Sequence, residues 1–351
     1  MTNRKTLLPT FQSVPSGLLA ASRTATLNLD RGKRFHIINL EISDDGTASG
    51  VAGVGATPSW GVIDGTASAA ANVAAGPPIV ATNGAVLASS AEFDLNNLVG
   101  KIRVLINGTV QREMTAFELN RLNVANNHNG LTDYSIKTSG TRGTAGYKVY
   151  LALYFAEPWR SSDTEAESNA WNIVGVDSFK IEIDLQPGCQ NPQLAGTYEW
   201  DLPVRQDIGH ITKWKRQSLS AGGSTQDFTD VSLLANRQKQ DFLTVISLFP
   251  SLEAVPKFVG KLKFTVDGID LQDLLNWNQN NVILLQRGMS PDTGAAPRFD
   301  LALDYNNPVN AAYPIFTAGS VNLHLEYFNG TAPAAAAGTV IAIIQVTGAP
   351  E

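Results

Sequence analysis

An internal repeat constrains the fold of this chain more than any other feature of its sequence. The segment Gly100–Gly108 reads Gly-Lys-Ile-Arg-Val-Leu-Ile-Asn-Gly, and the segment Gly260–Gly268 reads Gly-Lys-Leu-Lys-Phe-Thr-Val-Asp-Gly. In both segments basic and apolar side chains alternate, as is typical of a strand with one buried face, and the closing Asn-Gly or Asp-Gly favours a tight hairpin turn. The repeat predicts two similar β-rich halves.

A short helical signal follows each copy. After the first copy, Thr115 and Glu118 form a capping box, in which two side chains satisfy backbone N–H groups at a helix start. After the second copy, Asp270 can cap a turn that contains the leucines of 271–275. These signals predict one short helix in a loop of each half.

A second, weaker echo is found between two later segments. Ala145-Gly146 and Tyr154-Phe155 reappear as Ala318-Gly319 and Tyr327-Phe328, although the strand residues between them are out of phase. Either a bulge or coincidence explains the mismatch.

The rest of the chain also favours strands. Phe179–Leu185 and Val321–Tyr327 alternate strictly between apolar and polar residues. Only 17% of residues are charged, and 26 Asn and 30 Gly occur against 12 Lys, which suits a turn-rich β protein better than a helical array. Residues 46–92, rich in small residues, are expected to form thin strands with a long excursion.

The predicted organisation has three parts. Residues 1–20 form an N-terminal arm, residues 21–187 the first β-sandwich and residues 188–351 the second. The junction is placed within 186–192, where turn-forming residues cluster between two strand-like runs.

Charge is unevenly distributed. The chain carries −6, whereas residues 1–36 hold six basic residues and one acid, so no general polyanion-binding surface is expected. A basic arm could contact phosphates or a lipid surface, or it could be a frayed, solvated terminus. No signal-peptide core and no membrane-spanning run is found, so we expect the product to stay in the cell or to leave by lysis.

Catalytic chemistry is hard to find in this sequence. Four histidines are scattered without a metal-binding spacing, and His36 and His324 lie in strand-like runs. Residues 161–168 gather three carboxylates but are read as a solvated loop, and Cys189, the single cysteine, as a buried inert thiol. Asn107 and Asn329 match the glycosylation sequon but are read as turn residues. We therefore predict no enzyme activity, no catalytic, cofactor-binding or metal-binding residues, and no cofactor.

These features together resemble a known family. The paired segments at 100–103 and 260–263, the helical signals after them, the terminal strands at 323–328 and 341–346, and the polar, basic opening at 1–14 are similar to double jelly-roll major capsid proteins. This is the lineage of tectiviruses, corticoviruses and the adenovirus hexon, whose virions are icosahedral.

The resemblance implies both a fold and a role. The fold is all-β, with two tandem eight-stranded jelly-roll sandwiches and short helices in loops. The role is a structural virion protein of a bacteriophage: a homotrimer forms a pseudo-hexameric capsomer of the viral coat, assembled in the host cytoplasm. The implied partners are neighbouring capsomers, penton proteins and minor capsid proteins. The N-terminal arm would lie near a neighbouring capsomer or an internal membrane. No sequence-specific binding of nucleic acid is implied.

Three alternatives remain open. Double jelly-rolls also occur in a glycoamidase, and tandem β modules bind glycans, although secreted forms of either would carry an export signal. A trimeric viral spike is the third alternative. The low charge and abundant amides fit lateral contacts between capsid subunits, because a charge desolvated at a contact is costly unless it is paired.

Overall fold

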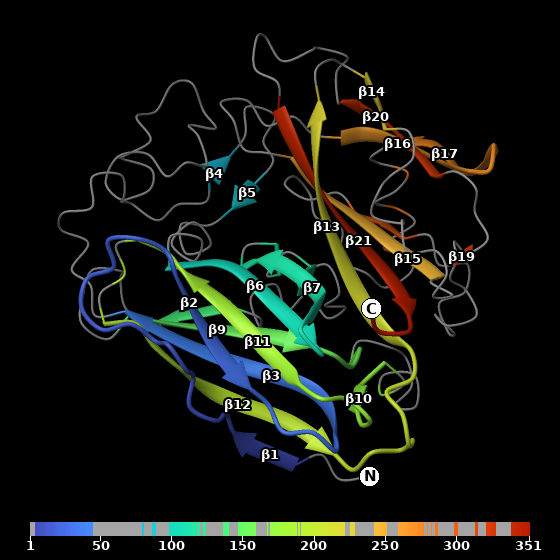
Figure 1. Ribbon diagram of the computed structural model, residues 1–351. Helices are drawn as coiled ribbons and strands as arrows, with labels where there is room; N and C mark the ends of the chain where they lie inside the picture. Colours follow the sequence, from blue (N-terminus) through green and yellow to red (C-terminus); the bar gives the residue numbers. More distant parts are fainter. Residues whose placement is uncertain are drawn as a thin grey trace. The chain divides into compact units, whose positions relative to one another are not determined.

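The computed structural model describes the chain in segments, which are coloured along the sequence in Figure 1. They are residues 4–44, 79–80, 86–88, 98–116, 118–119, 122–123, 136–139, 147–158, 167, 169–187, 189, 191–221, 225–228, 242–250, 259–276, 279, 282, 285–286, 298–300, 313–314, 321–327 and 338–351. The chain divides into two compact units. The first comprises residues 1–58, 90–212 and 349–351, and the second comprises residues 59–89 and 213–348.

The first unit consists of two antiparallel sheets. One sheet has the order β1-β12-β3-β9-β8, with β10 also paired to β3, and the other contains the order β7-β6-β11-β2. The strands are β1 (Arg4–Leu7), β2 (Arg23–Asn28), β3 (Lys33–Asp44), β6 (Val99–Ile106), β7 (Thr109–Thr115), β8 (Ile136–Ser139), β9 (Tyr147–Tyr154), β10 (Trp171–Ile173), β11 (Phe179–Leu185) and β12 (Gln193–Asp201).

An aromatic cluster joins these two sheets. The ring of Phe35 on β3 lies 5.1 Å from that of Phe179 on β11, and Phe155 lies 4.8 Å from Trp171. Along β11 buried and partly exposed residues alternate without a break, as the sequence predicts. β11 therefore buries one face, and the aromatic core of the first unit lies between the sheets.

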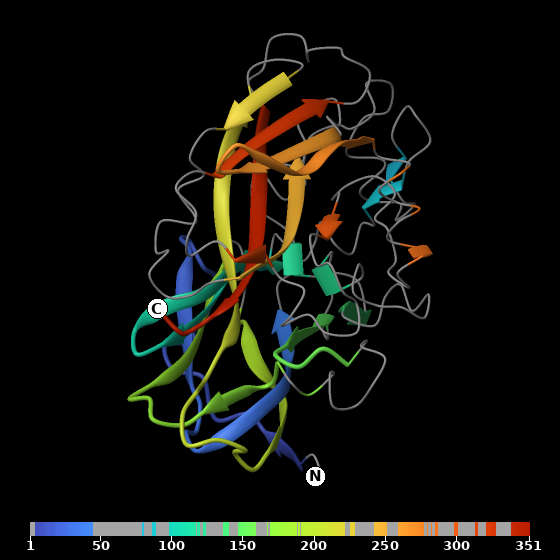
Figure 2. The ribbon, with the colours of Figure 1, turned by 90° about the vertical axis from the view of Figure 1, so that its right-hand side faces the viewer.

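The second unit also has two main sheets. One contains the order β18-β15-β21-β13, with β19 paired to β15, and the other has the order β14-β20-β16-β17 and crosses the first (Figure 2). The strands are β4 (Ile79–Val80) and β5 (Val86–Ala88), which pair with each other, β13 (Ile211–Ala221), β14 (Thr225–Phe228), β15 (Phe242–Pro250), β16 (Val259–Val266), β17 (Ile269–Asn276), β18 (Arg298–Asp300), β19 (Tyr313–Pro314), β20 (Val321–Tyr327) and β21 (Gly338–Gly348).

The repeated segments form equivalent hairpins. Asn107 and Gly108 join β6 to β7 with φ angles of 52° and 79°, and Asp267 and Gly268 join β16 to β17 with φ angles of 50° and 78°. Positive φ at both turn positions belongs to the tight turn whose twist matches two antiparallel strands. The hairpins predicted from the sequence repeat are confirmed.

Each hairpin continues into the same sheet arrangement. The order β7-β6-β11-β2 in the first unit matches β17-β16-β20-β14 in the second. Phe179 of β11 lies opposite Ile106, and Val321 of β20 lies opposite Val266, the equivalent hairpin residue. The register is thus repeated as well as the order.

The other two sheets correspond in the same way. The order β1-β12-β3-β9 matches β13-β21-β15-β18, and β10 on β3 matches β19 on β15. The register of β3 with β12 skips His36, and that of β15 with β21 skips Thr244, so a bulge is kept at the same place. A shared order, register and bulge support duplication of one sandwich.

Two sequence predictions are corrected by these strands. Asp270 does not cap a helical turn, because residues 269–276 form β17 and pairing with β16 overrides the helical tendency of the leucines. Helical residues follow later, at Gln279, Val282, Leu285 and Gln286. The second echo is coincidental, since Tyr327 ends β20, the equivalent of β11, whereas Tyr154 ends β9.

The capping box after the first hairpin is confirmed. The backbone N–H of Thr115 donates to Glu118 Oε2 at 2.8 Å, and that of Glu118 donates to Thr115 Oγ1 at 3.2 Å. Of the excursion predicted at 46–92, the described residues are those of β4 and β5.

The order of the strands bears on where the boundary between the two repeats lies. The correspondence runs from β1–β12 to β13–β21, which favours a boundary between Asp201 and Ile211 over a junction at 187/188. We propose the later boundary. Residues 4–20, expected in an arm, include β1, and the backbone of Gln12 exchanges hydrogen bonds with Thr26.

The two turn glycines should tolerate alanine about equally. A Cβ at Gly108 or Gly268 meets no atom within 4 Å, so only the left-handed backbone opposes it. We expect Gly108→Ala and Gly268→Ala each to lower the free energy of unfolding by about 1 kcal/mol. Urea unfolding of both variants measures this, and a loss at one turn only would contradict their equivalence.

Candidate functional site

The histidines, which are the residues best suited to catalysis or metal binding, do not come together in the described part of the chain. His36 and His324 lie on β3 and β20, His210 precedes β13, and His128 is outside the described residues. Among the described residues no group of three or more His, Cys, Asp or Glu side chains has metal-binding geometry.

The other candidate residues from the sequence that the structure describes make contacts within the fold. Of the acidic segment 161–168 only Glu167 is described, and its carboxylate accepts a hydrogen bond from Arg34. Cys189 is buried, as predicted, with Sγ 3.5 Å from the carbonyl oxygen of Leu98. Asn107 accepts backbone hydrogen bonds from Asp177 and Ser178 through Oδ1, which fits its reading as a turn residue. Asn329 lies outside the described residues.

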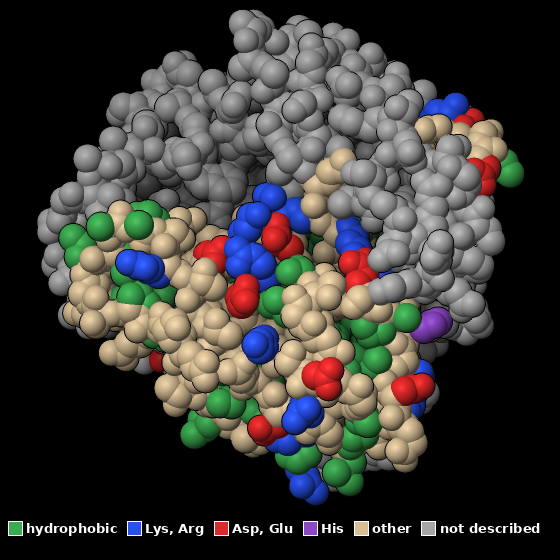
Figure 3. Space-filling model, viewed as in Figure 1, with side chains coloured by type: hydrophobic (Ala, Val, Ile, Leu, Met, Phe, Trp, Pro, Cys, Tyr) green, Lys and Arg blue, Asp and Glu red, His purple; other side chains and the backbone are tan. Residues whose placement is uncertain are grey.

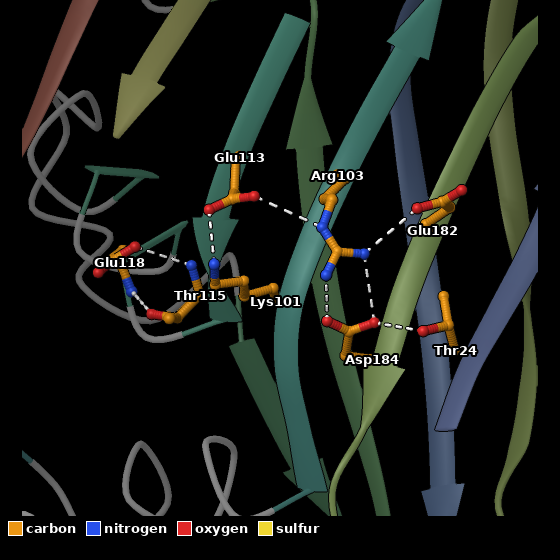
Figure 4. A network of polar contacts seen from close by, with 8 residues as sticks. All are labelled: Thr24, Lys101, Arg103, Glu113, Thr115, Glu118, Glu182 and Asp184. Atoms are coloured by element: carbon orange, nitrogen blue, oxygen red, sulfur yellow. Dashed lines mark hydrogen bonds and ion pairs between the residues drawn. The ribbon is translucent and has the colours of Figure 1, made fainter. Parts of the chain in front are cut away.

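A ladder of charges crosses the sheet formed by β7, β6, β11 and β2. Arg103 on β6 lies between Glu113 on β7 and two acids on β11, Glu182 and Asp184 (Figure 4). Lys101 donates to Glu113 at 2.8 Å. Acidic and basic side chains are also interspersed on the face shown in Figure 3.

The acidic side chains of this ladder stabilise the charged form of Arg103. Partial burial disfavours the charged guanidinium, but hydrogen bonding and charge from Asp184, with help from Glu182 and Glu113, raise the pKa of Arg103. Thr24 on β2 donates to Asp184 at 2.6 Å and extends the contacts to a fourth strand. Because its charges are paired across the strands, the ladder ties the sheet together.

A second charged cluster is buried at the start of β3. Arg34 Nε donates to Asp201 Oδ1 at 2.7 Å, its Nη2 donates to Asp201 Oδ2, and Nη2 also donates to Glu167 at 2.8 Å. His36 Nε2 lies 3.2 Å from Asp201 Oδ2. Burial alone would raise the pKa of Asp201, but hydrogen bonds and charge from Arg34 and His36 lower it.

A third buried charge lies on aromatic rings. Arg112 on β7 donates to the carbonyl oxygens of Thr212 at 2.7 Å and Tyr154 at 2.6 Å. Its guanidinium carbon lies 4.7 Å from the ring centre of Trp171 and 5.3 Å from that of Phe155. Complete burial lowers the pKa of Arg112 to about 9. The two carbonyls and two ring faces stabilise the charged form against that burial.

The edge of the other sheet carries basic and aromatic side chains. The guanidinium carbon of Arg4, on β1, lies 5.2 Å from the ring centre of Trp200. The ammonium nitrogen of Lys33, on β3, lies 4.4 Å from the same ring centre. Lys5 pairs with Glu199 at 3.1 Å. Leu7 is 77% exposed, so β1 presents a large apolar side chain to solvent.

Comparisons with known proteins give matches in structure alone. Neither protein-family models nor curated protein sequences match the chain. The major capsid protein P2 of bacteriophage PM2 matches with a TM-score of 0.64 and 14% identity, over 99% of this chain and 97% of that one. VP54 of PBCV-1 matches with a TM-score of 0.57 and 9% identity, over 99% and 94% of the two chains. The Faustovirus major capsid protein matches with a TM-score of 0.52 and 9% identity, over 99% and 90%.

The chain has the double jelly-roll fold of viral major capsid proteins. The likeness extends over nearly the full length of both partners, so it includes both sandwiches. The all-β fold predicted from the sequence is confirmed. At this level of identity the likeness concerns the fold.

Two features of this double jelly-roll were not predicted from its sequence. The ordered edge strand β1 was expected as part of an arm, and the buried clusters around Asp201 and Arg112 have no motif. Asp201 lies 167 residues from Arg34 in the chain, so only the pairing of β3 with β12 brings them together. No described helix is both long and apolar enough to cross a membrane.

Proposed function

We propose that this chain is a major capsid subunit that forms homotrimers of pseudo-hexagonal outline, which tile an icosahedral shell. The supporting observation is the full-length likeness to three capsid proteins, combined with duplication inside the chain. Each chain contributes two sandwiches of the same topology, so three chains would supply six similar lobes. A ring of six such lobes packs in a sheet with hexagonal neighbours.

The charges of the described residues fit a structural role. Within the ladder around Arg103, acidic and basic side chains are hydrogen-bonded to each other, and the same holds within the Asp201 cluster. These pairs stabilise the subunit without presenting a reactive group. A protein that only assembles needs well-packed sandwiches and paired charges. We propose that the chain acts without enzyme activity and without a cofactor.

The proposed location is the virion, after assembly in the cytoplasm of a bacterial host. The proposed partners are neighbouring capsomers, penton proteins and minor capsid proteins, with no sequence-specific contact to nucleic acid. The basic N-terminal residues would face a neighbouring subunit or an internal membrane. Of these two, the pairing of β1 with β12 supports a protein neighbour, because it holds these residues in an ordered strand.

Native mass measurement with negative-stain imaging tests the proposal. A stable particle of about 112 kDa, three times the 37.5 kDa of one chain, with a six-lobed outline is expected. A monomer at micromolar concentration would contradict it. Glycan release from a glycoprotein by the purified chain would instead favour the glycoamidase alternative.

A further inference from the structure

β1 and β17 are two of the strands that end a sheet order in the described part of the chain. β1 ends the sheet order β1-β12-β3-β9-β8, and β17 ends the order β14-β20-β16-β17. The side chains of β1 are all exposed, and so are Asp267, Gly268, Ile269 and Asp270 at the turn and start of β17. An open edge presents backbone N–H and C=O groups that can pair with another strand.

The hydrogen-bond pattern of β1 shows which groups face outward. The N–H of Leu8 donates to the carbonyl oxygen of Gly196 at 2.9 Å, continuing the ladder with β12. Inward and outward groups alternate along an antiparallel strand. The backbone N–H and C=O groups of Lys5 and Leu7 therefore point away from β12, toward the open edge.

The duplication gives each of these two open edges a counterpart in the other repeat. β1 has the same place in its sheet as β13 in the other repeat, and β17 has the same place as β7. Within the first unit, side chains of β7 bind the start of β13 and the C-terminus. Arg112 donates to Thr212, and Gln111 Oε1 accepts from the N–H of Glu351 at 3.0 Å. Arg112 of β7 thus contacts Thr212, at the start of the strand that is the counterpart of β1.

We propose that β1 of one copy of this chain docks along β17 of a second copy, repeating at the subunit interface the contact between β7 and the start of β13. Resting on the proposed trimer, this inference names the two edges that would hold it together. Lys5 already pairs with Glu199, and Asp270 with Lys263 at 2.8 Å, so the pairing is argued from the equivalent places of the strands in the two repeats. Different edges meet, so the contact is head-to-tail and closes into a ring if the rotation allows.

Cross-linking between introduced cysteines tests the edge assignment. Leu7 and Ile269 are 77% and 63% exposed, whereas the native Cys189 is buried, so Leu7→Cys with Ile269→Cys should react selectively. A bis-maleimide with a reach of about 8 Å is suitable, because it exceeds the spacing of paired strands, about 4.8 Å. Most of the double variant should become covalent dimers and trimers on a denaturing gel, and neither single variant should do so.

Tyr150 supplies a matched control. It is 40% exposed on β9, three strands from β1 in the same sheet, or about 14 Å at normal strand spacing. Tyr150→Cys with Ile269→Cys should stay uncrosslinked. Equal linking of both pairs, or a link confined to single chains, would overturn the proposal.

A backbone variant gives a second readout that does not depend on the reagent. Leu7→Pro removes an outward N–H, which an edge strand tolerates, while Leu7→Ala keeps it. Leu7→Pro should shift the native mass toward monomer, and Leu7→Ala should shift it less. If the native chain is a trimer and Leu7→Pro leaves it intact, the edge assignment fails and the capsid proposal stands. If the native chain is a monomer, both fail.

Discussion

Replacement of Gly196 by alanine should destabilise the first unit by about 4 kcal/mol or more, enough to unfold a marginally stable domain. Gly196 lies on β12 with φ at +146°, and a Cβ there would be 1.9 Å from the carbonyl oxygen of Asn39. That oxygen belongs to β3, the central strand of the sheet, so it cannot move aside without breaking strand pairing. The clash is with backbone on one side and with Leu8 at 3.0 Å on the other.

Urea unfolding followed by tryptophan fluorescence measures this effect, since Trp171 and Trp200 both lie in the first unit. Gly108→Ala is the matched control, because Gly108 also has a positive φ but has open space around it. The control should lose only about 1 kcal/mol. If both variants lose the same small amount, the close approach of β12 to β3 at Gly196 is wrong.

Local sequence signals predicted the hairpins well. Asn107-Gly108 and Asp267-Gly268 specify their turns through the few residues that accept positive φ, and the alternation in Phe179–Leu185 specifies its buried face. Both signals act between residues that are close in the chain, so tertiary packing had little chance to override them.

Elements that depend on partners far away in the sequence were predicted less accurately. Leucines at 271, 274 and 275 suit a helix, yet they lie in β17 because β16 offers a pairing edge. β1 has four residues and no distinctive pattern, and only β12, about 190 residues later, gives it a place. Gly196 is one of 30 glycines, and nothing in its neighbours marks the contact with Asn39.

The same reasoning explains the buried charges around Asp201. A pair of oppositely charged residues far apart in sequence has no local signature, and burial is set by the packing of whole sheets. Because Arg34 and Asp201 lie opposite each other on β3 and β12, the strand pairing itself brings the charges into contact. Such a pair tolerates loss of one partner poorly, since the remaining charge stays buried.

Asp201→Asn should therefore cost the first unit about 3 to 5 kcal/mol at neutral pH. Asp201 is 2% exposed, and its amide replacement leaves the Arg34 guanidinium without its buried counter-ion. Glu167→Gln is the matched control, because it removes the other carboxylate on Arg34 but at a side chain that is 35% exposed. The control should lose less than about 1 kcal/mol, as expected for a pair screened by solvent.

The cost should also depend on pH in a defined direction. Since the folded protein lowers the pKa of Asp201, its contribution is fully present above the unfolded value of about 3.9 and is lost as pH falls through the lower folded value. The difference in unfolding free energy between the native chain and Asp201→Asn should be constant from pH 7 to about pH 5 and should shrink below about pH 4. Urea unfolding at a series of pH values, at one protein concentration, measures that difference. A gap that widened as the pH fell would contradict the prediction, because it would mean that the Asp201 carboxylate does not stabilise the folded protein.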